Sequence, residues 1–325
     1  MLFDLHPKEN LKDLFDRETE YNTLSELVNS GRWVAVLGKR MTGKTSLVKT
    51  FAKENDGIYV NLLGAGGIEG FARRLGATGG FGLEEIGIDL KVVHLKWGKL
   101  AEGLFEKFSN KIIVLDEVQD IASPHLLKLL KYVWDTYRVR IIFSGSCIGL
   151  MRRILEPSYT SSLYGREPAK LVLKTFTPEL SRNFLLEGFK QYRVRPNPDE
   201  IEEAVEKLNG YVGWLTYYGN FRCVEKMDHQ KALQATIRRG VAIIKGELEN
   251  FLKNRRRDLY VKVLRMAARG VRWSELKDEL DVNNKVLRDV LQTLLDVMIL
   301  DAENGYYQTS DPILRETVRK LPIKR

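Results

Sequence analysis

The stretch that decides the fold is Trp33–Thr45, which reads W-V-A-V-L-G-K-R-M-T-G-K-T. It opens with five apolar residues, Trp33–Leu37, the length of a buried strand, and continues with Gly38–Thr45, which matches G-x-x-x-x-G-K-[S/T]. The two glycines leave the backbone path free of side chains, so that successive N–H groups turn inward at phosphate oxygens. A helix expected from Lys44 onward adds its positive end at the same point. The stretch therefore predicts a strand, a phosphate-binding loop and a helix of an α/β domain.

This loop supplies candidate ligands for a nucleotide and its metal ion. Lys44 is expected to reach the β- and γ-phosphates, and the Thr45 hydroxyl is expected to bind Mg²⁺. ATP with Mg²⁺ is the predicted ligand, and GTP stays an alternative because the sequence does not reveal the base preference. The residues expected to bind the nucleotide here are Gly38, Lys39, Arg40, Met41, Thr42, Gly43, Lys44, Thr45 and Ser46.

A second strand-like stretch, Lys111–Glu117, ends in two carboxylates and has the form of a Walker B strand. A buried strand ending in a carboxylate places Asp116 beside the metal, at the sheet edge where ligands bind. Glu117, one residue later, points differently and is expected to orient or deprotonate the attacking water. Lys44, Asp116 and Glu117 are thus predicted catalytic groups, with Thr45 and Asp116 as the metal ligands.

Short apolar runs alternate with helical patterns through the first half of the chain, which predicts a parallel sheet covered on both faces. The adjacent Asp116-Glu117 pair favours the P-loop subclass with an extra strand between the two motifs, so the expected sheet order is 5-1-4-3-2. Gly64–Gly87 is glycine-rich and aperiodic, which predicts a long loop after the second strand. The expected strands are Trp33–Leu37, Ile58–Asn61, Ile112–Leu115, Ile141–Phe143 and Leu171–Leu173.

From about Thr177 this alternation ends and helical patterns follow, which indicates a helical lid domain. After the basic stretch Lys253–Arg257, three helical patterns precede two strand-like pieces joined through Glu303-Asn304-Gly305. Three helices and a hairpin with an Asn-Gly turn predict a winged helix-turn-helix. The predicted domains are a P-loop ATPase α/β domain over 1–176, a lid over 177–253 and a winged helix over 254–325.

The composition limits the class of protein. Lys and Arg number 52 and Asp and Glu 43, a formal net charge of +9, which favours an anionic partner such as nucleic acid. A solvated Lys/Arg/Glu surface explains the same balance equally well. No apolar run approaches the roughly 20 residues of a membrane helix, and Met1–Lys12 lacks the apolar segment of a signal peptide. Cys147 and Cys223 lack metal-ligand spacing and suit a reducing compartment, so we expect a cytoplasmic protein without membrane contact.

With these motifs the chain resembles the archaeal ATPase family, in the STAND branch of AAA-like P-loop NTPases, over nearly its whole length. Phe15–Glu18 is similar to the family's N-terminal box near the adenine pocket, and Ser144–Ser146 to its sensor-1 segment. Ser162–Arg166 resembles its P-L-Y-G-R motif, with Ser162 where proline is usual. The resemblance implies that Arg17 contacts the nucleotide and that Ser144 or Ser146 senses the γ-phosphate. It also implies that Arg166 supplies charge to the transferring phosphoryl group, within the chain or to a neighbouring copy; an ordinary ion pair is the alternative for either arginine.

Two further segments extend the resemblance to the second half of the chain. Asn209–Leu215 resembles the family's G-G-x-P-x-x-L lid segment, with Val212 in place of the proline that helps to aim the lid at the nucleotide. Tyr307–Pro312, Y-Q-T-S-D-P, resembles the end of the family's winged-helix hairpin. The resemblance thus implies a lid and a winged helix behind the ATPase domain, and the missing proline puts the coupling of the lid to the nucleotide in question.

The predicted helix Asn283–Leu295 is the candidate recognition helix of the winged helix. Its apolar positions form one stripe, and its outer face carries residue types that contact bases and phosphates in the major groove. Arg255–Arg257 would add phosphate contacts, but acidic residues lie nearby. Duplex DNA, a protein partner and a purely intramolecular role therefore all stay open. The candidate DNA-binding residues are Asn284, Lys285, Arg288 and Gln292.

Three functions fit these features. The first is an ATP-driven switch, in which the bound γ-phosphate changes the lid and the winged helix and hydrolysis resets them. The second is a DNA-binding regulator or origin-recognition-like protein that holds ATP as a slowly hydrolysed structural ligand. The third is a signalling scaffold whose homo-oligomerisation is controlled by nucleotide.

Overall fold

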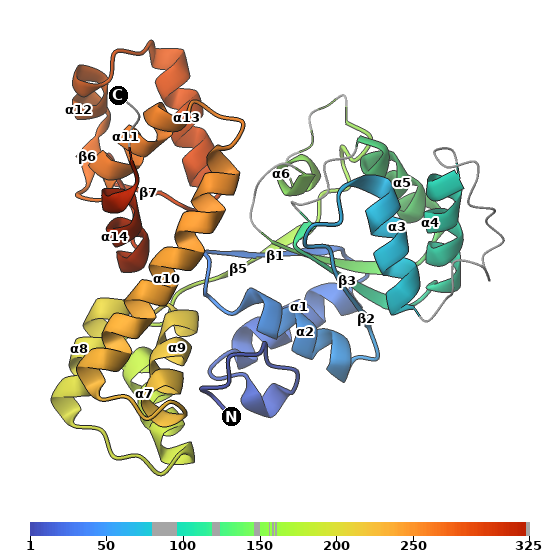
Figure 1. Cartoon of the computed structure of the whole chain (residues 1–325). Helices are drawn as coiled ribbons and strands as arrows, with labels where there is room; N and C mark the ends of the chain where they lie inside the picture. The colour runs from blue at the N-terminus through green and yellow to red at the C-terminus, as the bar shows by residue number, and fades with distance from the viewer. Residues whose placement is uncertain are drawn as a thin grey trace. The chain divides into compact units, whose positions relative to one another are not determined.

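Figure 1 follows the chain over the residues that the computed structural model describes: 1–79, 96–118, 124–145, 150–155, 157, 159 and 161–322. They belong to two compact units. The sheet unit is made of Pro7–Gly38 and Gly43–Leu173, and the helical unit of Met1–His6, Lys39–Thr42 and Lys174–Arg325. The division passes through the phosphate loop, because its four middle residues, Lys39–Thr42, belong to the helical unit.

The sheet unit is built on five strands that pair in parallel in the order β2-β3-β4-β1-β5. This is the predicted order 5-1-4-3-2 counted from the opposite edge, so the expected sheet is confirmed. Each strand lies at its predicted position with small changes at the ends. The strands are β1 (Val34–Gly38), β2 (Ile58–Asn61), β3 (Ile112–Asp116), β4 (Arg140–Ser144) and β5 (Ala169–Leu173).

Helices cover both faces of the sheet, as Figure 1 shows. On one face, α1 and α2 form a buried apolar cluster with alternate residues of the central strands, including Val36 of β1 and Val114 of β3. Every residue of β1 and β3 is buried, as expected for central strands of a parallel sheet. The helical elements of this unit are η1 (Leu11–Asp13), α1 (Glu18–Asn29), α2 (Lys44–Glu54), α3 (Gly67–Thr78), α4 (Lys96–Lys107), α5 (Pro124–Thr136) and α6 (Leu150–Leu155).

The strand register brings the polar strand ends to one edge of the sheet. Val36 lies opposite Ser144, and Leu115 lies opposite Phe143, the residue before Ser144. Asn61 of β2 lies opposite Asp116. The carboxyl ends of β1, β3 and β4 therefore present Gly38, Asp116 and Ser144 on the same edge, where parallel α/β sheets bind ligands.

The prediction of a long loop over Gly64–Gly87 is wrong in its first half. Gly67–Thr78 forms α3, in which Phe71, Ala72, Leu75 and Gly76 are buried. Glycines lower helix propensity and hid this pattern, but the i, i+4 pair Phe71 and Leu75 gains burial that compensates for it. Residues 80–87 of the predicted loop lie outside the described residues.

The helical unit contains four long helices ahead of its C-terminal part. Three of them begin at a polar residue whose side chain accepts a bond from the first turn: Thr177 for α7, Asn197 for α8 and Asp228 for α10. These caps fix where the three helices begin. The helices are α7 (Pro178–Gln191), α8 (Pro198–Leu208), α9 (Val212–Cys223) and α10 (His229–Leu252).

The C-terminal part has the predicted winged-helix layout of three helices and a hairpin, with a third strand and a final helix besides. The three strands pair antiparallel in the order β6-β8-β7. Asn304 and Gly305 have φ values of 50° and 79°, the left-handed pair that a tight hairpin turn requires. The elements are α11 (Arg257–Ala267), β6 (Val271–Arg272), α12 (Trp273–Glu279), α13 (Asn284–Asp296), β7 (Asp301–Glu303), β8 (Tyr306–Gln308) and α14 (Pro312–Lys320).

Across the described part of the chain, none of the helices has the length and apolar character needed to span a membrane. The two compact units do not test the predicted separation of a lid, 177–253, from a winged helix, 254–325, which stays a prediction.

Candidate nucleotide-binding site

The phosphate loop joins the end of β1 to the start of α2. Gly43, directly before α2, has φ 94° and offers no side-chain cap to the helix. The first N–H groups of α2 therefore meet no capping side chain at their own N-cap, which suits them to bind an anion. Lys44 Nζ donates to the carbonyl oxygen of Gly38 at 2.8 Å, across the base of the loop. An ammonium group carries three N–H donors, so Lys44 can bind phosphate oxygens while it keeps this bond.

Asp116 ends β3 as predicted and is 1% exposed. Its Oδ1 accepts a bond from the backbone N–H of Glu117 at 3.1 Å, and its Oδ2 accepts one from the Tyr59 hydroxyl at 2.8 Å. Burial, and after it the Asp116 carboxylate, raise the pKa of Tyr59 well above its usual range, so the phenol keeps its proton. Sequence reasoning missed Tyr59; its only signal was a tyrosine in the strand that neighbours the Walker B strand.

Glu117 follows Asp116 with a backbone φ of 57°. The left-handed conformation costs an L-residue roughly 1–2 kcal/mol, and such strain concentrates at functional sites. The side chain is half-buried. This local geometry is compatible with the predicted role of Glu117 toward the attacking water.

Ser144 ends β4 and is 0% exposed, yet its hydroxyl has no hydrogen-bond partner among the described residues. A buried hydroxyl without a partner costs free energy and calls for an explanation. A phosphate group at the carboxyl edge of the sheet would provide the missing partner. Ser146, the alternative sensor, lies outside the described residues.

These residues fit ATP with Mg²⁺. Mg²⁺ is usually held by one or two carboxylates together with substrate phosphates, and Asp116 supplies a buried carboxylate. The Thr45 hydroxyl, the predicted second protein ligand, takes part in no hydrogen bond with any residue that the structure describes. Ser46 accepts a bond from the Lys8 backbone N–H at 3.1 Å, which ties the first turn of α2 to the N-terminal segment.

The two predicted arginines are engaged elsewhere. Arg166 donates through Nε to Asp135 Oδ1 at 2.9 Å and through Nη1 to the Tyr164 carbonyl at 3.3 Å. Arg17 is 7% exposed and pairs with Glu20 at 2.5 Å. Each therefore forms the ion pair that was the alternative interpretation, and their nucleotide roles stay predictions.

The apex of the phosphate loop, Lys39–Thr42, is part of the helical unit. Lys39 Nζ lies 2.6 Å from Asp301 Oδ2 at the start of β7 and 2.6 Å from Ser310 Oγ. The Lys39 and Asp301 side chains are 25% and 33% exposed, so the pair is partly shielded from water. Arg40 forms an ion pair with Glu247 of α10. Both cationic side chains of the apex thus bind carboxylates of the helical unit.

Met41 completes this set of contacts through its backbone. Its carbonyl accepts a bond from the Gly213 N–H, at the start of α9, at 3.0 Å. A Cβ on Gly213 would lie 2.4 Å from Met41 Sδ and 2.9 Å from Met41 Cβ, so a larger residue would force Met41 to shift. Gly213 directly follows Val212, the residue that replaces the expected lid proline. The lid segment contacts the loop through this backbone hydrogen bond.

The two segments that resemble family motifs in the second half of the chain meet each other here. Ser310 Oγ shares a hydrogen bond with the Tyr211 hydroxyl at 2.8 Å, and Asn209 Nδ2 donates to the Ser310 carbonyl at 2.9 Å. Asp311 accepts a bond from Trp214 Nε1 at 3.3 Å and caps α14. Burial raises the pKa of Asp311, against the opposing effect of its hydrogen bonds and of Arg40. We name this set of contacts, with Lys39, Arg40 and Met41, the apex clamp.

The predicted recognition helix is α13. Leu287, Val290, Leu291 and Leu294 are buried as expected, and Val286 is half-buried. The four candidate DNA-binding residues are all exposed: Asn284, Lys285, Arg288 and Gln292. Gln292 bonds Asp296 at 2.7 Å, whereas Lys285 and Arg288 make no side-chain contact within the described residues.

The basic stretch at the start of α11 is less available for phosphate contacts than its sequence suggested. Arg255 stacks on the Phe251 ring at 4.1 Å, and Arg257 pairs with Glu249 at 2.9 Å and donates to the Pro322 carbonyl. Only Arg256 of the three is exposed. Of the three expected phosphate contacts, two side chains therefore serve the packing of the helical unit.

Comparison with known proteins identifies the family and the fold of the chain. A family model for ATPase domains predominantly from Archaea matches residues 14–217. Among solved structures, the Walker-type ATPase Paby2304 of Pyrococcus abyssi is 29% identical with a TM-score of 0.85, over 98% of this chain and 100% of that chain. The ORC2 protein of Aeropyrum pernix, in its ADPNP–ADP complexes, is 15% identical with a TM-score of 0.64, over 98% and 96%, and shows the fold alone. A search of the curated proteins finds no match.

Proposed function

The chain belongs to the family of ATPase domains found predominantly in Archaea, and from this premise we propose that it is an ATP-driven switch whose phosphate loop controls its lid and winged helix. Its enzymatic class is ATPase. The proposal concerns the residues that perform hydrolysis, the metal and the coupling to the C-terminal part.

At the site, ATP with Mg²⁺ would supply the phosphoryl group and the charge that neutralises the leaving phosphates. The loop backbone and the N-terminus of α2 would hold the phosphates, and the Lys44 ammonium group at the base of the loop would bind their oxygens. Thr45 and Asp116 would hold the metal, with Tyr59 orienting the Asp116 carboxylate. Glu117 orients the water, and Ser144 donates its unpartnered hydroxyl to the γ-phosphate.

The observation that carries the switch is the apex clamp. The backbone of Lys39–Thr42 is the part of the loop that must wrap around a phosphate, and the same residues bind Asp301, Ser310, Glu247 and Gly213. A ligand that rearranges the loop changes these contacts, and by linkage a change in the contacts alters ligand affinity by the same factor. The clamp is thus a direct physical connection between phosphate binding and the hairpin of the winged helix.

The test is amide hydrogen exchange of the 301–310 hairpin with and without ATP and Mg²⁺, in wild type and in Asp301→Asn. Asn keeps the shape but loses the charge that pairs with Lys39, so we expect ATP to change the exchange of the hairpin in wild type and much less in the variant. Glu303→Gln is the matched control, because Glu303 is exposed in the same hairpin and makes no side-chain contact with the described residues. Hairpin exchange indifferent to ATP in wild type, under conditions where ATP binding is measured, would contradict the switch.

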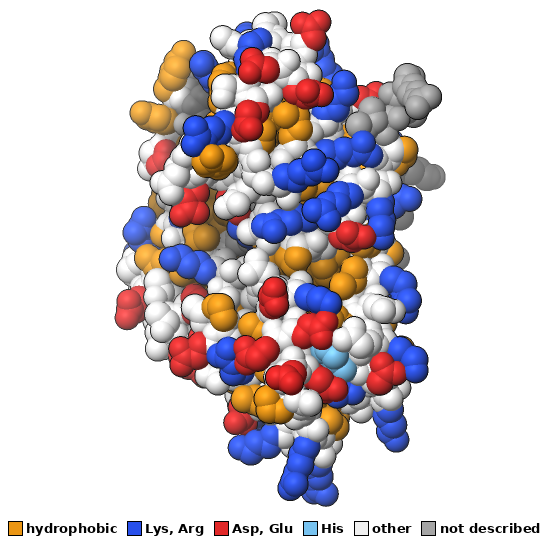
Figure 2. Space-filling model, turned by 90° about the vertical axis from the view of Figure 1, so that its left-hand side faces the viewer, with side chains coloured by type: hydrophobic (Ala, Val, Ile, Leu, Met, Phe, Trp, Pro, Cys, Tyr) orange, Lys and Arg blue, Asp and Glu red, His pale blue; other side chains and the backbone are white. Residues whose placement is uncertain are grey.

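A second candidate function, a DNA-binding regulator, is favoured by the exposed face of α13. Lys285 and Arg288 present positive charge without an ion-pair partner among the described residues. Figure 2 shows several Lys and Arg side chains side by side on one face of the molecule, which also suits an anionic partner. Against DNA, Asp289 is exposed on the same helix.

Duplex binding at several salt concentrations decides this candidate. Replacing Lys285 and Arg288 by Ala removes two phosphate contacts, so the slope of log K against log salt should fall by about 2 units. The control replaces Arg238 and Lys245 of α10 by Ala, which changes net charge equally at exposed positions. Equal losses in both variants would indicate nonspecific attraction, and no binding at low salt would exclude duplex DNA as the partner of α13.

A further inference from the structure

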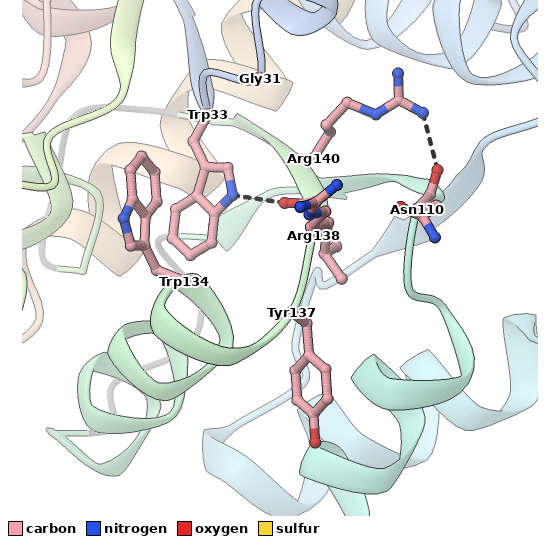
Figure 3. A pocket seen from close by; sticks show the side chains of 8 residues that line it. Gly31, Trp33, Asn110, Trp134, Tyr137, Arg138 and Arg140 are labelled. Carbon is pink, nitrogen blue, oxygen red and sulfur yellow. Dashed lines mark hydrogen bonds between the residues drawn. The ribbon is translucent and has the colours of Figure 1, made fainter.

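A cavity of about 380 Å³ opens at the amino edge of the parallel sheet (Figure 3). Trp33 precedes β1, Arg140 begins β4, and Asn110 lies two residues before β3. The phosphate loop, Asp116 and Ser144 lie at the carboxyl ends of these same strands. A five-residue strand spans roughly 13–16 Å at about 3.3 Å per residue, so the cavity and the nucleotide site occupy opposite edges of the sheet.

One side of the cavity is aromatic. The rings of Trp33 and Trp134 meet edge to face, with centroids 4.7 Å apart and an interplanar angle of 79°. Trp33 is 2% exposed and donates its indole N–H to the Val139 carbonyl at 2.9 Å, as the dashed line in Figure 3 shows. Its polar atom is satisfied and its ring orientation is therefore set. Tyr137 adds a third ring to the lining.

The other side carries hydrogen-bond donors. Figure 3 shows Arg138, Arg140 and Asn110 near one another, across from the two tryptophans. The Arg140 Nη2 donates to the Asn110 carbonyl at 2.8 Å, and the Asn110 N–H donates to the Arg138 carbonyl at 3.1 Å. These bonds fix the backbone that bears the donors.

The side chains of Arg138, Arg140 and Asn110 retain hydrogen-bond donors for a ligand. Over the residues that the structure describes, neither guanidinium group has a carboxylate partner, and the Asn110 carboxamide makes no hydrogen bond. Each guanidinium offers a planar fork of N–H groups that matches a carboxylate or a phosphate. Two positive charges line the same cavity as the aromatic rings and have no ion-pair partner among the described residues, which provides complementarity to an anion with a planar apolar body.

We propose that this cavity binds a small aromatic anion, a ring bearing a carboxylate or a phosphate. The ring packs against the half-buried Trp134, with the buried Trp33 behind it, and the acidic group binds the Arg138 and Arg140 guanidinium groups with help from Asn110. The volume lies within the range of small-molecule sites, and the combination of an apolar wall with a few convergent polar groups is typical of them. The site is separate from the nucleotide site and does not depend on the proposed switch.

The test titrates the full chain with benzoate, phenyl phosphate and the neutral benzyl alcohol, by calorimetry and by tryptophan fluorescence. We expect saturable binding of at least one anionic ring, and binding of the neutral ring at least about tenfold weaker, because a charge-assisted bond is lost. The preferred anion distinguishes a carboxylate ligand from a phosphate ligand. Saturating ATP with Mg²⁺ should leave this binding unchanged, since the two sites lie on opposite sheet edges.

Substitutions of Arg138 and Arg140 test whether the anionic ring binds in this cavity. Arg138→Gln and Arg140→Gln each remove one charge and should weaken the anionic ring about tenfold, and together they should abolish saturable binding. Arg195→Gln is the control, because Arg195 is exposed in the helical unit and makes no side-chain contact with the described residues. Equal affinity for charged and neutral rings, binding that survives the double substitution, displacement by ATP, or no saturable binding in the millimolar range would overturn the proposal.

Discussion

The base and the apex of the phosphate loop differ in what their polar groups contact. At the base, Gly38 and Gly43–Ser46 belong to the sheet unit, and the Thr45 hydroxyl and the first turn of α2 keep binding capacity. At the apex, Lys39 and Arg40 are bound to Asp301 and Glu247 of the helical unit. One eight-residue motif therefore combines a base suited to a ligand with an apex tied to the lid and winged helix. In the proposed switch, the backbone of the apex wraps around the phosphates while its side chains bind the helical unit, so the apex links the ligand to the C-terminal part.

Lys44→Ala at the base of the loop is expected to have the largest effect and tests whether the base binds the phosphates. The substitution removes the ammonium group that is expected to bind the β- and γ-phosphates, so ATP affinity and turnover should each fall at least about a hundredfold. Lys128→Ala, at an exposed position of α5, is the control. Filter binding and a phosphate-release assay measure both quantities; normal turnover in Lys44→Ala protein would exclude this site.

Glu117→Gln separates binding from chemistry at the base. Gln keeps the size and loses the carboxylate that orients the water, so turnover should fall about a hundredfold or more while ATP affinity changes little. Glu26→Gln, at an exposed position of α1, controls for the charge change. A parallel loss of affinity and turnover in Glu117→Gln would assign the residue to nucleotide binding instead.

Gly213→Ala acts on the apex from the lid side. The added Cβ would lie 2.4 Å from Met41 Sδ and 2.9 Å from Met41 Cβ, so the free energy of unfolding should fall by about 1–3 kcal/mol. The control is Gly246→Ala in α10, where a Cβ meets nothing within 4 Å and the change should stabilise by about 0.5–1 kcal/mol. Urea denaturation monitors both variants. A shift of the same sign in the two would show that Met41 gives way without cost.

Ser144→Ala probes the unpartnered hydroxyl and carries the smallest expected effect on stability. Because the hydroxyl has no partner among the described residues, its removal should leave the free energy of unfolding unchanged or raise it by up to about 1 kcal/mol. Ser181→Ala is the matched control: Ser181 is equally buried but donates to the Thr177 carbonyl at 2.8 Å, so its loss should cost about 1 kcal/mol. Turnover should fall only in Ser144→Ala if this hydroxyl binds the γ-phosphate.

Local patterns in the sequence predicted most of the fold. Continuous apolar runs identified β1 to β5, because central parallel strands are buried on both faces. Helical patterns were expected from about Thr177, and the structure shows that polar caps begin α7, α8 and α10. The glycine-rich α3 was missed because its helix depends on burial rather than on propensity. The two-residue β6 was missed because so short a strand exists only through its pairing with β8.

The sequence by itself determined the phosphate loop and the Asp116-Glu117 strand end, since each depends on residues adjacent in the chain. The sheet order followed from the P-loop subclass that these two motifs indicate. Only the tertiary structure decided that Tyr59 supports Asp116, that Arg166 pairs with Asp135, and that Lys39 binds Asp301 and Ser310. Lys39 and Asp301 are separated by 262 positions. No local period or propensity encodes such a contact, because it forms only when packing brings two surfaces within the few ångströms that an ion pair requires.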